Sequence, residues 1–185
     1  MLDCCQPLEQ TKLKGMTLQT LHCLAQCNGA QSVRHYGDAI SVENFREDAQ
    51  TTCSSAESRV LLLSYDRKTV RQSGSGHFSP VGGYNPDSDM LLILDVARFK
   101  YPPHWLPLQM VYEALQPLDS DSGRCRGYLL LAPTADMIQR CCTTACDPSS
   151  DETTNPCEGG QALNVESVMR VAEAVVAAAS EAKTT

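Results

Sequence analysis

The sequence has few aromatic residues, no hydrophobic run of membrane-spanning length and no basic stripe. Its 185 residues include three Phe, one Trp and six Tyr, and no stretch reaches the roughly 18 apolar residues that a transmembrane helix needs. The net charge is −7 and the sequence pI is about 5.0. Nucleic-acid-binding proteins carry clustered Lys and Arg. The composition therefore argues against a membrane partner and against a nucleic-acid partner.

The first residues also lack the pattern of a secretion signal. Only Leu2 separates Met1 from Asp3, Cys4 and Cys5, whereas a signal peptide has a basic region and then an apolar stretch. We therefore expect a cytoplasmic protein. Thiols stay reduced in that compartment, so the ten cysteines predict free thiols and not a disulfide framework.

A β-hairpin is the most informative structural pattern in the sequence. An apolar strand from Met90 to Val96 follows a cluster of turn-forming residues at 82–87. If the turn centres on Pro86, His77 lies opposite Asp95, and opposed residues have Cβ atoms about 4.5–5.5 Å apart. A carboxylate that orients an imidazole belongs to cysteine and serine acyl-transfer sites. A surface ion pair explains the same two residues, so the hairpin alone leaves both interpretations open.

Hydrophobic periodicity and capping residues predict the other elements. In chain order they are a short helical turn within 1–14, helices at 17–28 and 41–53 capped by Thr17 and Ser41, a buried strand at 59–66, the hairpin strands, a helix from Trp105 to Leu115 and a strand at 127–132 that closes the sheet. Helices followed by an antiparallel sheet are typical of the α+β class.

The composition changes after about residue 135. Residues 136–163 are polar and rich in turn formers, which predicts a linker. The linker contains Cys141, Cys142, Cys146 and Cys157. No CxxC pair has a matching second half there, so a closed zinc site is not indicated and the role of this Cys141–Cys157 cluster stays open. Residues 164–185 are rich in Ala and Val and predict a C-terminal helix capped by Asn164.

Several long segments resemble the phytochelatin synthase family. They are the opening MLDCCQPLE, LHCLAQCNGA (21–30), GHFSPVGGYN (76–85), LDVARFKYPPHW (94–105) and RGYLLLAP (126–133). Enzymes of this family are γ-glutamylcysteine dipeptidyl transpeptidases that make metal-binding peptides from glutathione. The resemblance implies a catalytic domain over residues 1–135 with a papain-like cysteine-protease fold. It also implies a Cys, His and Asp triad in which His77 and Asp95 supply the last two members.

One part of the family pattern is missing. The nucleophilic Cys of the family lies upstream of the segment that MLDCC resembles, so we expect an incomplete papain-like fold and no glutathione turnover by these 185 residues alone. Arg98 is a candidate to bind a substrate carboxylate, although a solvated arginine fits the sequence equally well. Tyr101, His104 and Trp105 are expected to shape or support the site, His104 in a structural role.

Four cysteines near the start form a candidate metal site, namely Cys4, Cys5, Cys23 and Cys27. The last two are spaced i,i+4, which places their sulfur atoms on one side of a helix. Thiolates at this spacing bind soft ions such as Cd²⁺, Cu⁺ or Zn²⁺, but buried Cys residues acting as small apolar side chains explain the pattern as well. The resemblance implies a heavy-metal ion (cadmium, zinc or copper) as activator or as a metal–glutathione thiolate, and no organic cofactor.

Three functions are compatible with this sequence. The first is a transpeptidase that makes phytochelatins from glutathione for heavy-metal detoxification. The second is a hydrolase on the same fold that acts on glutathione conjugates, and the third is a non-enzymatic thiol protein that binds soft metals or pairs with a full-length copy. Glutathione and its metal complexes are the expected partners, and a homodimer remains open. The first two differ only in whether an amine or water accepts the acyl group, which these residues do not decide.

Overall fold

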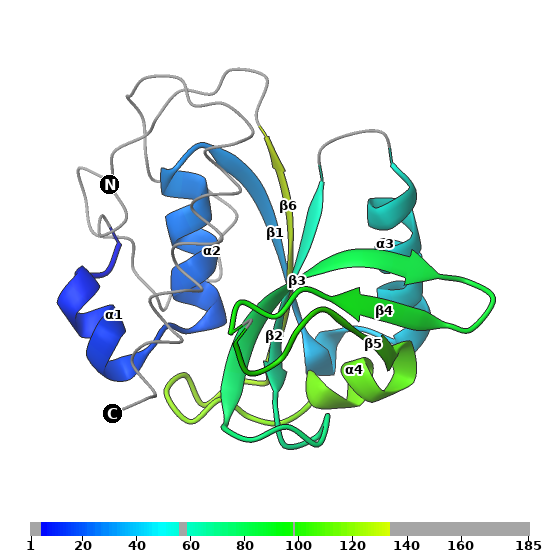
Figure 1. The fold of residues 1–185 in the computed structure, drawn as a ribbon. Helices are drawn as coiled ribbons and strands as arrows, with labels where there is room; N and C mark the ends of the chain where they lie inside the picture. The colour runs from blue at the N-terminus through cyan, green and yellow to red at the C-terminus, as the bar shows by residue number, and fades with distance from the viewer. Residues whose placement is uncertain (1–4, 56–58, 98, 134–185) are drawn as a thin grey trace. The chain divides into compact units, whose positions relative to one another are not determined.

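The computed structural model describes residues 5–55, 59–97 and 99–133 of the 185. Its elements are α1 Leu8–Lys14, α2 Leu18–Cys27, β1 Ala30–Tyr36, the short 3₁₀ helix η1 Gly37–Ala39, α3 Val42–Ser54, β2 Val60–Asp66, β3 Gly76–Asn85, β4 Met90–Ile93, β5 His104–Pro107, α4 Leu108–Ala114 and β6 Gly127–Pro133 (Figure 1). The described residues fall into two compact units, residues 5–33 with 131–133 in the first and residues from 34 to 130 in the second. The predicted linker and C-terminal helix lie outside the described residues. None of the described helices has the length and apolar composition of a membrane-spanning segment.

The described part of the first unit is mainly helical, as the sequence predicts. Helix α2 begins after Thr17, whose hydroxyl accepts a hydrogen bond from the backbone N–H of Thr20 at 3.1 Å. Such an N-cap satisfies a donor that the helix itself leaves unpaired. Helix α1 falls within the predicted helical turn, and its Leu13 is 84% exposed.

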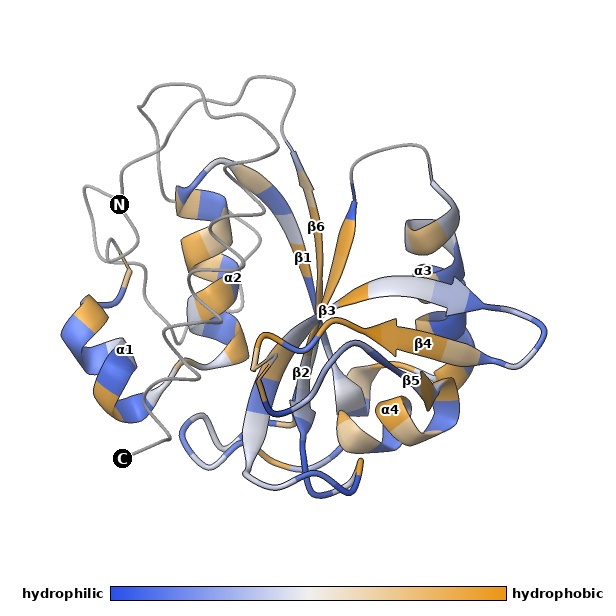
Figure 2. Cartoon of the chain, in the orientation of Figure 1, coloured by the Kyte–Doolittle hydropathy of each residue, from blue (hydrophilic) through white to orange (hydrophobic). Residues whose placement is uncertain are grey.

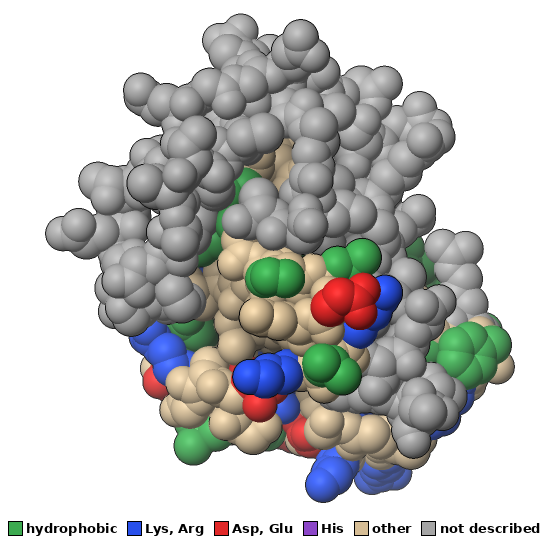
Figure 3. Space-filling view, turned by 90° about the vertical axis from the view of Figure 1, so that its left-hand side faces the viewer, with side chains coloured by type: hydrophobic (Ala, Val, Ile, Leu, Met, Phe, Trp, Pro, Cys, Tyr) green, Lys and Arg blue, Asp and Glu red, His purple; other side chains and the backbone are tan. Residues whose placement is uncertain are grey.

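Figure 3 shows one face of the molecule, on which hydrophobic side chains of the described residues lie singly among polar and charged ones.

The strands form one six-stranded sheet in the order β1-β6-β2-β3-β4-β5. Neighbours from β2 to β5 pair in antiparallel fashion, and helices accompany the sheet, which confirms the α+β class. Strand β6 lies between β1 and β2, so the prediction that it closes the sheet is wrong. Strand β1 was not predicted, because its sequence AQSVRHY contains one strongly apolar residue among polar ones.

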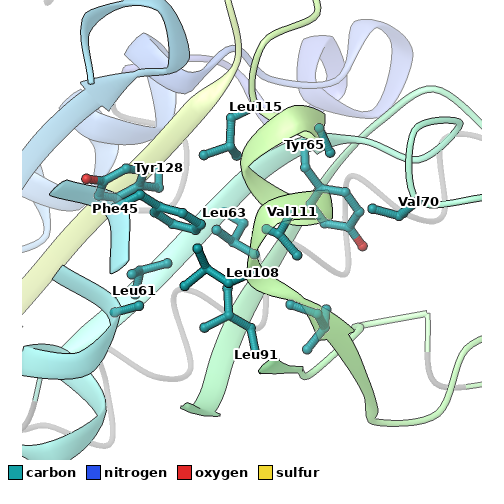
Figure 4. Packing of buried hydrophobic residues seen from close by; sticks show 13 residues of the cluster. Phe45, Leu61, Leu63, Tyr65, Val70, Leu91, Leu108, Val111, Leu115 and Tyr128 are labelled. Carbon is teal, nitrogen blue, oxygen red and sulfur yellow. The ribbon is translucent and has the colours of Figure 1, made fainter. Parts of the chain in front are cut away.

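A single hydrophobic cluster holds helices α3 and α4 against the sheet of the second unit. Side chains alternate along β2, so that Leu61, Leu63 and Tyr65 enter this cluster from one sheet face. Figure 4 shows the rings of Phe45 from α3 and Tyr128 from β6 next to each other, with centroids 5.2 Å apart. Burying one such large side chain contributes roughly 1.5–3 kcal/mol. The cluster therefore anchors the strands that carry the candidate site.

The hairpin is present, but its register differs from the predicted one. Asn85 pairs with Met90, and a bulge at Gly82 shifts the register before Val81 pairs with Ile93. Strand β4 ends at Ile93, not at 96, and the partner of His77 is a residue of β2. In Figure 2, β4 is hydrophobic along most of its length, whereas the turn at its start is hydrophilic. The two residues predicted to face each other across the hairpin are therefore not a cross-strand pair.

The predicted helix from 105 to 115 is partly wrong. Its first residues belong to β5, in which Trp105 pairs with Leu92 of β4. Two consecutive prolines before β5 favour extended backbone, and the burial of its residues alternates as in a strand. The helix α4 begins at Leu108, directly after Pro107.

Candidate active site

The imidazole of His77 contacts the carboxylate of Asp95 in the second unit. Nε2 of His77 lies 3.0 Å from Oδ1 of Asp95. The two residues are buried, with 8% and 1% of their surfaces exposed. The ring of Tyr65, the β2 partner of His77, meets the imidazole edge-on at a centroid distance of 6.0 Å. The predicted contact between His77 and Asp95 is confirmed, but the predicted register of the two hairpin strands is wrong.

A short loop after β4 places Asp95. The backbone N–H of Leu94 donates to the carbonyl of Pro80 at 3.0 Å, so the chain stays beside β3 for one residue beyond the strand. The chain then turns, and the N–H of Ala97 donates to Oδ1 of Asp95 at 2.8 Å. An Asp side chain that accepts from the backbone two residues further on stabilises such a turn. The carboxylate is therefore held by its own loop as well as by His77.

Arg67 approaches the same carboxylate from the turn that joins β2 and β3. Its Nη2 atom lies 3.0 Å from Oδ1 and 2.8 Å from Oδ2 of Asp95, and its side chain is 6% exposed. The shorter contact is an ion pair without hydrogen-bond geometry, since Oδ2 has no hydrogen-bond partner among the described residues. Oδ1 thus accepts from Arg67, Ala97 and His77 together. Arg67 was missed in the sequence because a basic residue just after a strand is usually solvated.

The surroundings of Asp95 keep its carboxyl group ionised. Burial opposes ionisation and by itself raises the pKa. The hydrogen bond and charge of His77, the N–H of Ala97 and the charge of Arg67 outweigh burial, so that the pKa of Asp95 lies below its ordinary value. An ionised Asp95 makes Nε2 the protonated nitrogen of His77. Nδ1 is then the ring atom that can exchange a proton with a reactant.

A second arginine, Arg126, lies beside the start of β3. A Cβ atom added to Gly76 would come within 2.0 Å of the Arg126 Nη1 atom, so the guanidinium packs directly on the residue before His77. The Arg126 side chain is 9% exposed, its ion-pair distance to Asp119 is 3.7 Å, and Nε has no hydrogen-bond partner in the described part of the chain. No periodicity or spacing in the sequence indicates a role for this arginine in the site. A guanidinium can bind a carboxylate through two parallel N–H donors.

The residues predicted to bind substrate or to support the site differ in where the structure places them. Arg98, the predicted carboxylate-binding residue, lies outside the described residues and stays a prediction. Tyr101 stacks under Arg67, with the guanidinium carbon 4.8 Å from the ring centroid. His104 accepts or donates a hydrogen bond to the Gln72 side chain at 3.0 Å. Trp105 is 46% exposed on β5.

The cysteines of the predicted metal site lie in the first unit. Cys4 is outside the described residues. Sγ of Cys5 lies 3.1 Å from Sγ of Cys27, and Cys27 is disulfide-bonded. The expectation that all thiols are reduced is therefore wrong for Cys27. The described residues contain no cluster of three or more metal-ligating side chains, so metal binding stays a prediction.

Cys53 in α3 fits the apolar interpretation that the sequence suggests. It is partly buried, and burial raises the pKa of its thiol. A raised pKa keeps the thiol protonated and unreactive at neutral pH. Cys53 is therefore a suitable control position for experiments on the site.

Comparison with known proteins identifies the family of the chain. A family model described as phytochelatin synthase matches residues 1–128. Glutathione gamma-glutamylcysteinyltransferase 3 of Lotus japonicus is 47% identical over 132 residues, which cover 71% of this chain and 27% of that protein. The glutathione gamma-glutamylcysteinyltransferase of Schizosaccharomyces pombe is 45% identical over 133 residues, covering 72% of this chain and 32% of its own length.

A third relative, glutathione gamma-glutamylcysteinyltransferase 1 of Triticum aestivum, is 42% identical over 150 residues. These residues cover 81% of this chain and 30% of the wheat protein. The chain thus spans about a third or less of the length of each of these relatives. The family model covers most of the described residues, including His77, Asp95 and Arg126. The chain belongs to the phytochelatin synthase family.

Proposed function

We propose that the chain is part of a glutathione gamma-glutamylcysteinyltransferase that makes phytochelatins for heavy-metal detoxification. The observation that supports this most strongly is the buried contact between His77 and an ionised Asp95, 3.0 Å apart, within the segment that the family model matches. We also propose that the α+β arrangement is the sheet-bearing part of a papain-like fold. Three relatives whose names state the transferase activity support the same reaction.

The proposed reaction uses His77 first as an acid and then as a base. A cysteine thiolate attacks the carbonyl carbon of the Cys–Gly peptide bond of glutathione, and the carbon–nitrogen bond breaks. His77 donates its Nδ1 proton to the departing glycine nitrogen, which leaves a γ-Glu-Cys thioester. The amino group of a second glutathione attacks this thioester and gives a proton back to Nδ1, and the thiolate is released. Asp95 holds the ring in one tautomer and stabilises its charged form.

Two arginines are proposed to bind the carboxylates of glutathione. Arg126 has a buried Nε without a hydrogen-bond partner among the described residues, and its Nη1 lies against Gly76, next to the proposed acid–base residue His77. A guanidinium in this position binds a carboxylate in two-pronged geometry more tightly than an ammonium group does. Arg98 remains a second proposed carboxylate ligand. Each carboxylate contact would fix the substrate with its peptide bond near the imidazole.

The metal is proposed to enter mainly as part of the substrate. A soft ion such as Cd²⁺ binds the glutathione thiol as a thiolate, so a metal–glutathione complex can be the acceptor or donor of the acyl group. Activation by metal bound to the chain's own cysteines is the alternative. Replacing glutathione by an S-alkyl glutathione, whose sulfur cannot form a thiolate, separates the two. Reaction of the S-alkyl substrate without metal supports the substrate role.

The experiment that tests this function measures glycine release and γ-Glu-Cys transfer from glutathione with Cd²⁺. It compares the 185-residue chain with an extended form, in which a segment that carries the nucleophilic Cys implied by the family resemblance precedes Met1. We expect the extended form to release glycine and to build γ-Glu-Cys polymers, and the 185-residue chain to do neither. Glycine release without polymers would identify a hydrolase instead. Absence of both activities in a folded extended form would contradict the proposal.

A further inference from the structure

A chain of hydrogen bonds leads away from Asp95 on the side opposite His77. Arg67 donates through Nη2 to Oδ1 of Asp95 at 3.0 Å and through Nη1 to Oε1 of Gln72 at 2.6 Å. Nε2 of Gln72 lies 3.0 Å from Nε2 of His104. Nδ1 of His104 lies 2.8 Å from the carbonyl oxygen of Pro102. These hydrogen bonds thus connect the β2–β3 turn to the residues that lead into β5.

The two end groups, the Arg67 guanidinium and the Pro102 carbonyl, determine which atom donates in every hydrogen bond of this series. Arg67 can only donate, so the oxygen of the Gln72 amide faces the guanidinium and its NH₂ group faces His104. The Pro102 carbonyl can only accept, so Nδ1 of His104 carries a proton and donates to it. Nε2 of His104 is then the unprotonated nitrogen that accepts from Gln72. One neutral tautomer of His104 satisfies all contacts, and neither the other tautomer nor the imidazolium does.

Other contacts restrict the guanidinium of Arg67 to this position. The centroid of the Tyr101 ring lies 4.8 Å from the guanidinium carbon of Arg67. The Tyr101 hydroxyl accepts a hydrogen bond from the N–H of Ser73 at 2.9 Å. The side chain of Arg67 is 6% exposed. Because a long side chain has many rotamers, its orientation depends on partners at both ends of the guanidinium. Asp95 supplies one end and Gln72 the other.

We propose that Gln72 and His104 are positioning residues, which hold Arg67 on Asp95 and thereby orient the carboxylate toward His77. This proposal rests on the proposed function for its role in catalysis, but the positioning itself does not require turnover. Without the Gln72 oxygen, Nη1 of Arg67 loses its partner and the guanidinium can rotate away from the carboxylate. Asp95 would then keep the imidazole, the Ala97 N–H and the neighbouring Tyr65 hydroxyl of β2. His104 acts indirectly, through Gln72, because it determines which end of the Gln72 amide faces Arg67.

The first test needs no substitution. In ¹⁵N NMR spectra of the 185-residue chain at neutral pH, we expect His104 to show an unprotonated Nε2 and a protonated Nδ1. The opposite tautomer would overturn the proposal, since Nε2–H cannot accept from the Gln72 amide. This readout stays valid even if a variant fails to fold.

The second test follows the Asp95 carboxyl group by ¹³C NMR during a pH titration of three variants. Arg67→Met should raise the titration midpoint of Asp95 by about one unit or more, because an opposite charge at this distance lowers a carboxyl pKa by about 1–3 units. Gln72→Leu and His104→Phe should shift it in the same direction by a smaller amount. His104→Gln, which keeps an acceptor on the side chain, should restore part of the wild-type midpoint.

An unchanged Asp95 midpoint in both Gln72→Leu and His104→Phe, together with lower melting temperatures, would overturn the proposal. The two residues would then only tie the turn to the β5 segment. These measurements use no glutathione and no nucleophile. A shifted midpoint together with an inactive extended form would therefore contradict the proposed function and leave the positioning role intact.

Discussion

His77 and Asp95 are in hydrogen-bond contact at 3.0 Å, although neither is the strand partner of the other. The contact depends on β3, a ten-residue strand whose first half pairs with β2 and whose second half pairs with β4. His77 lies on the first half, and Asp95 comes from the loop that follows β4. A bulge at Gly82 interrupts the second half just after Val81, the first residue that pairs with β4. Bulges of this kind often occur next to active sites, where they redirect a side chain.

The stability of the protein should depend on the ionisation of Asp95. Its pKa lies below the ordinary value of 3.8, and a carboxyl group with a lowered pKa in the folded state stabilises it above the unfolded pKa. This stabilisation is lost as the pH falls through the folded pKa. Because Asp95→Asn leaves Arg67 and His77 without a carboxylate, it should cost about 3–5 kcal/mol at pH 6. Below about pH 4 the difference from the wild type should shrink.

Urea unfolding of the wild type and of Asp95→Asn between about pH 6 and pH 3 checks this prediction. Asp87→Asn is the control, because that residue is exposed in the hairpin turn. A free-energy difference between wild type and Asp95→Asn that stays constant over the whole range would show that the charge of Asp95 adds nothing to stability.

Substitution of Gly76 should disturb substrate binding through Arg126. A methyl group at position 76 would come within 2.0 Å of Arg126 Nη1, so the guanidinium must move. Hydrogen bonds to a charged group contribute about 1.5–3 kcal/mol. In the extended form, Gly76→Ala should therefore raise KM for glutathione by about 10–100-fold. Gly83→Ala in the same strand is the matched control, since its added Cβ meets the nearest atoms at 3.9 Å. Equal KM values for both variants would argue against Arg126 as a carboxylate ligand.

Cadmium binding by the cysteines of the first unit should require a reductant. Cys27 is disulfide-bonded, and a disulfide sulfur is not a thiolate ligand. We propose that reduced Cys23 and Cys27, on the same side of α2, then bind Cd²⁺ together with Cys4 and Cys5. Isothermal titration of a chain with its four linker cysteines changed to Ser measures this without competition from the linker.

In that background, Cys23→Ser should weaken Cd²⁺ binding by more than about 100-fold, since even outer-shell partners of a metal change affinity by about 10–100-fold. Cys53→Ser should leave the affinity unchanged. Binding that is equally tight without a reductant, or unaffected by Cys23→Ser, would contradict a metal site on α2.

Local sequence signals predicted most elements correctly where capping and periodicity act within a few residues. Ser41 caps α3 through a reciprocal capping box with Asn44, as its position indicated. The apolar runs of β2 and β6 form strands as expected. The predicted helix at Trp105 failed because pairing with β4, a contact between distant segments, makes its first residues a strand.

The site was predicted in part for the same reason. The contact between His77 and Asp95 was found, but from a register that ignored the bulge at Gly82 and the early end of β4. Arg67 and Arg126 were not found, because they reach the site only through the tertiary fold. Arg67, for example, contacts a carboxylate 28 positions further along the chain. No spacing rule within one helix or hairpin joins such residues.

The rate of glycine release by the extended form, with and without the His77–Asp95 pair, tests the central claim most directly. His77→Ala and Asp95→Asn should each reduce the rate by about 10³–10⁴-fold, as losses of such groups do in other acyl-transfer enzymes. Cys53→Ser, with circular dichroism and melting temperature as checks on folding, should keep a rate close to that of the parent. Folded His77→Ala and Asp95→Asn variants that release glycine as fast as the parent would contradict the account.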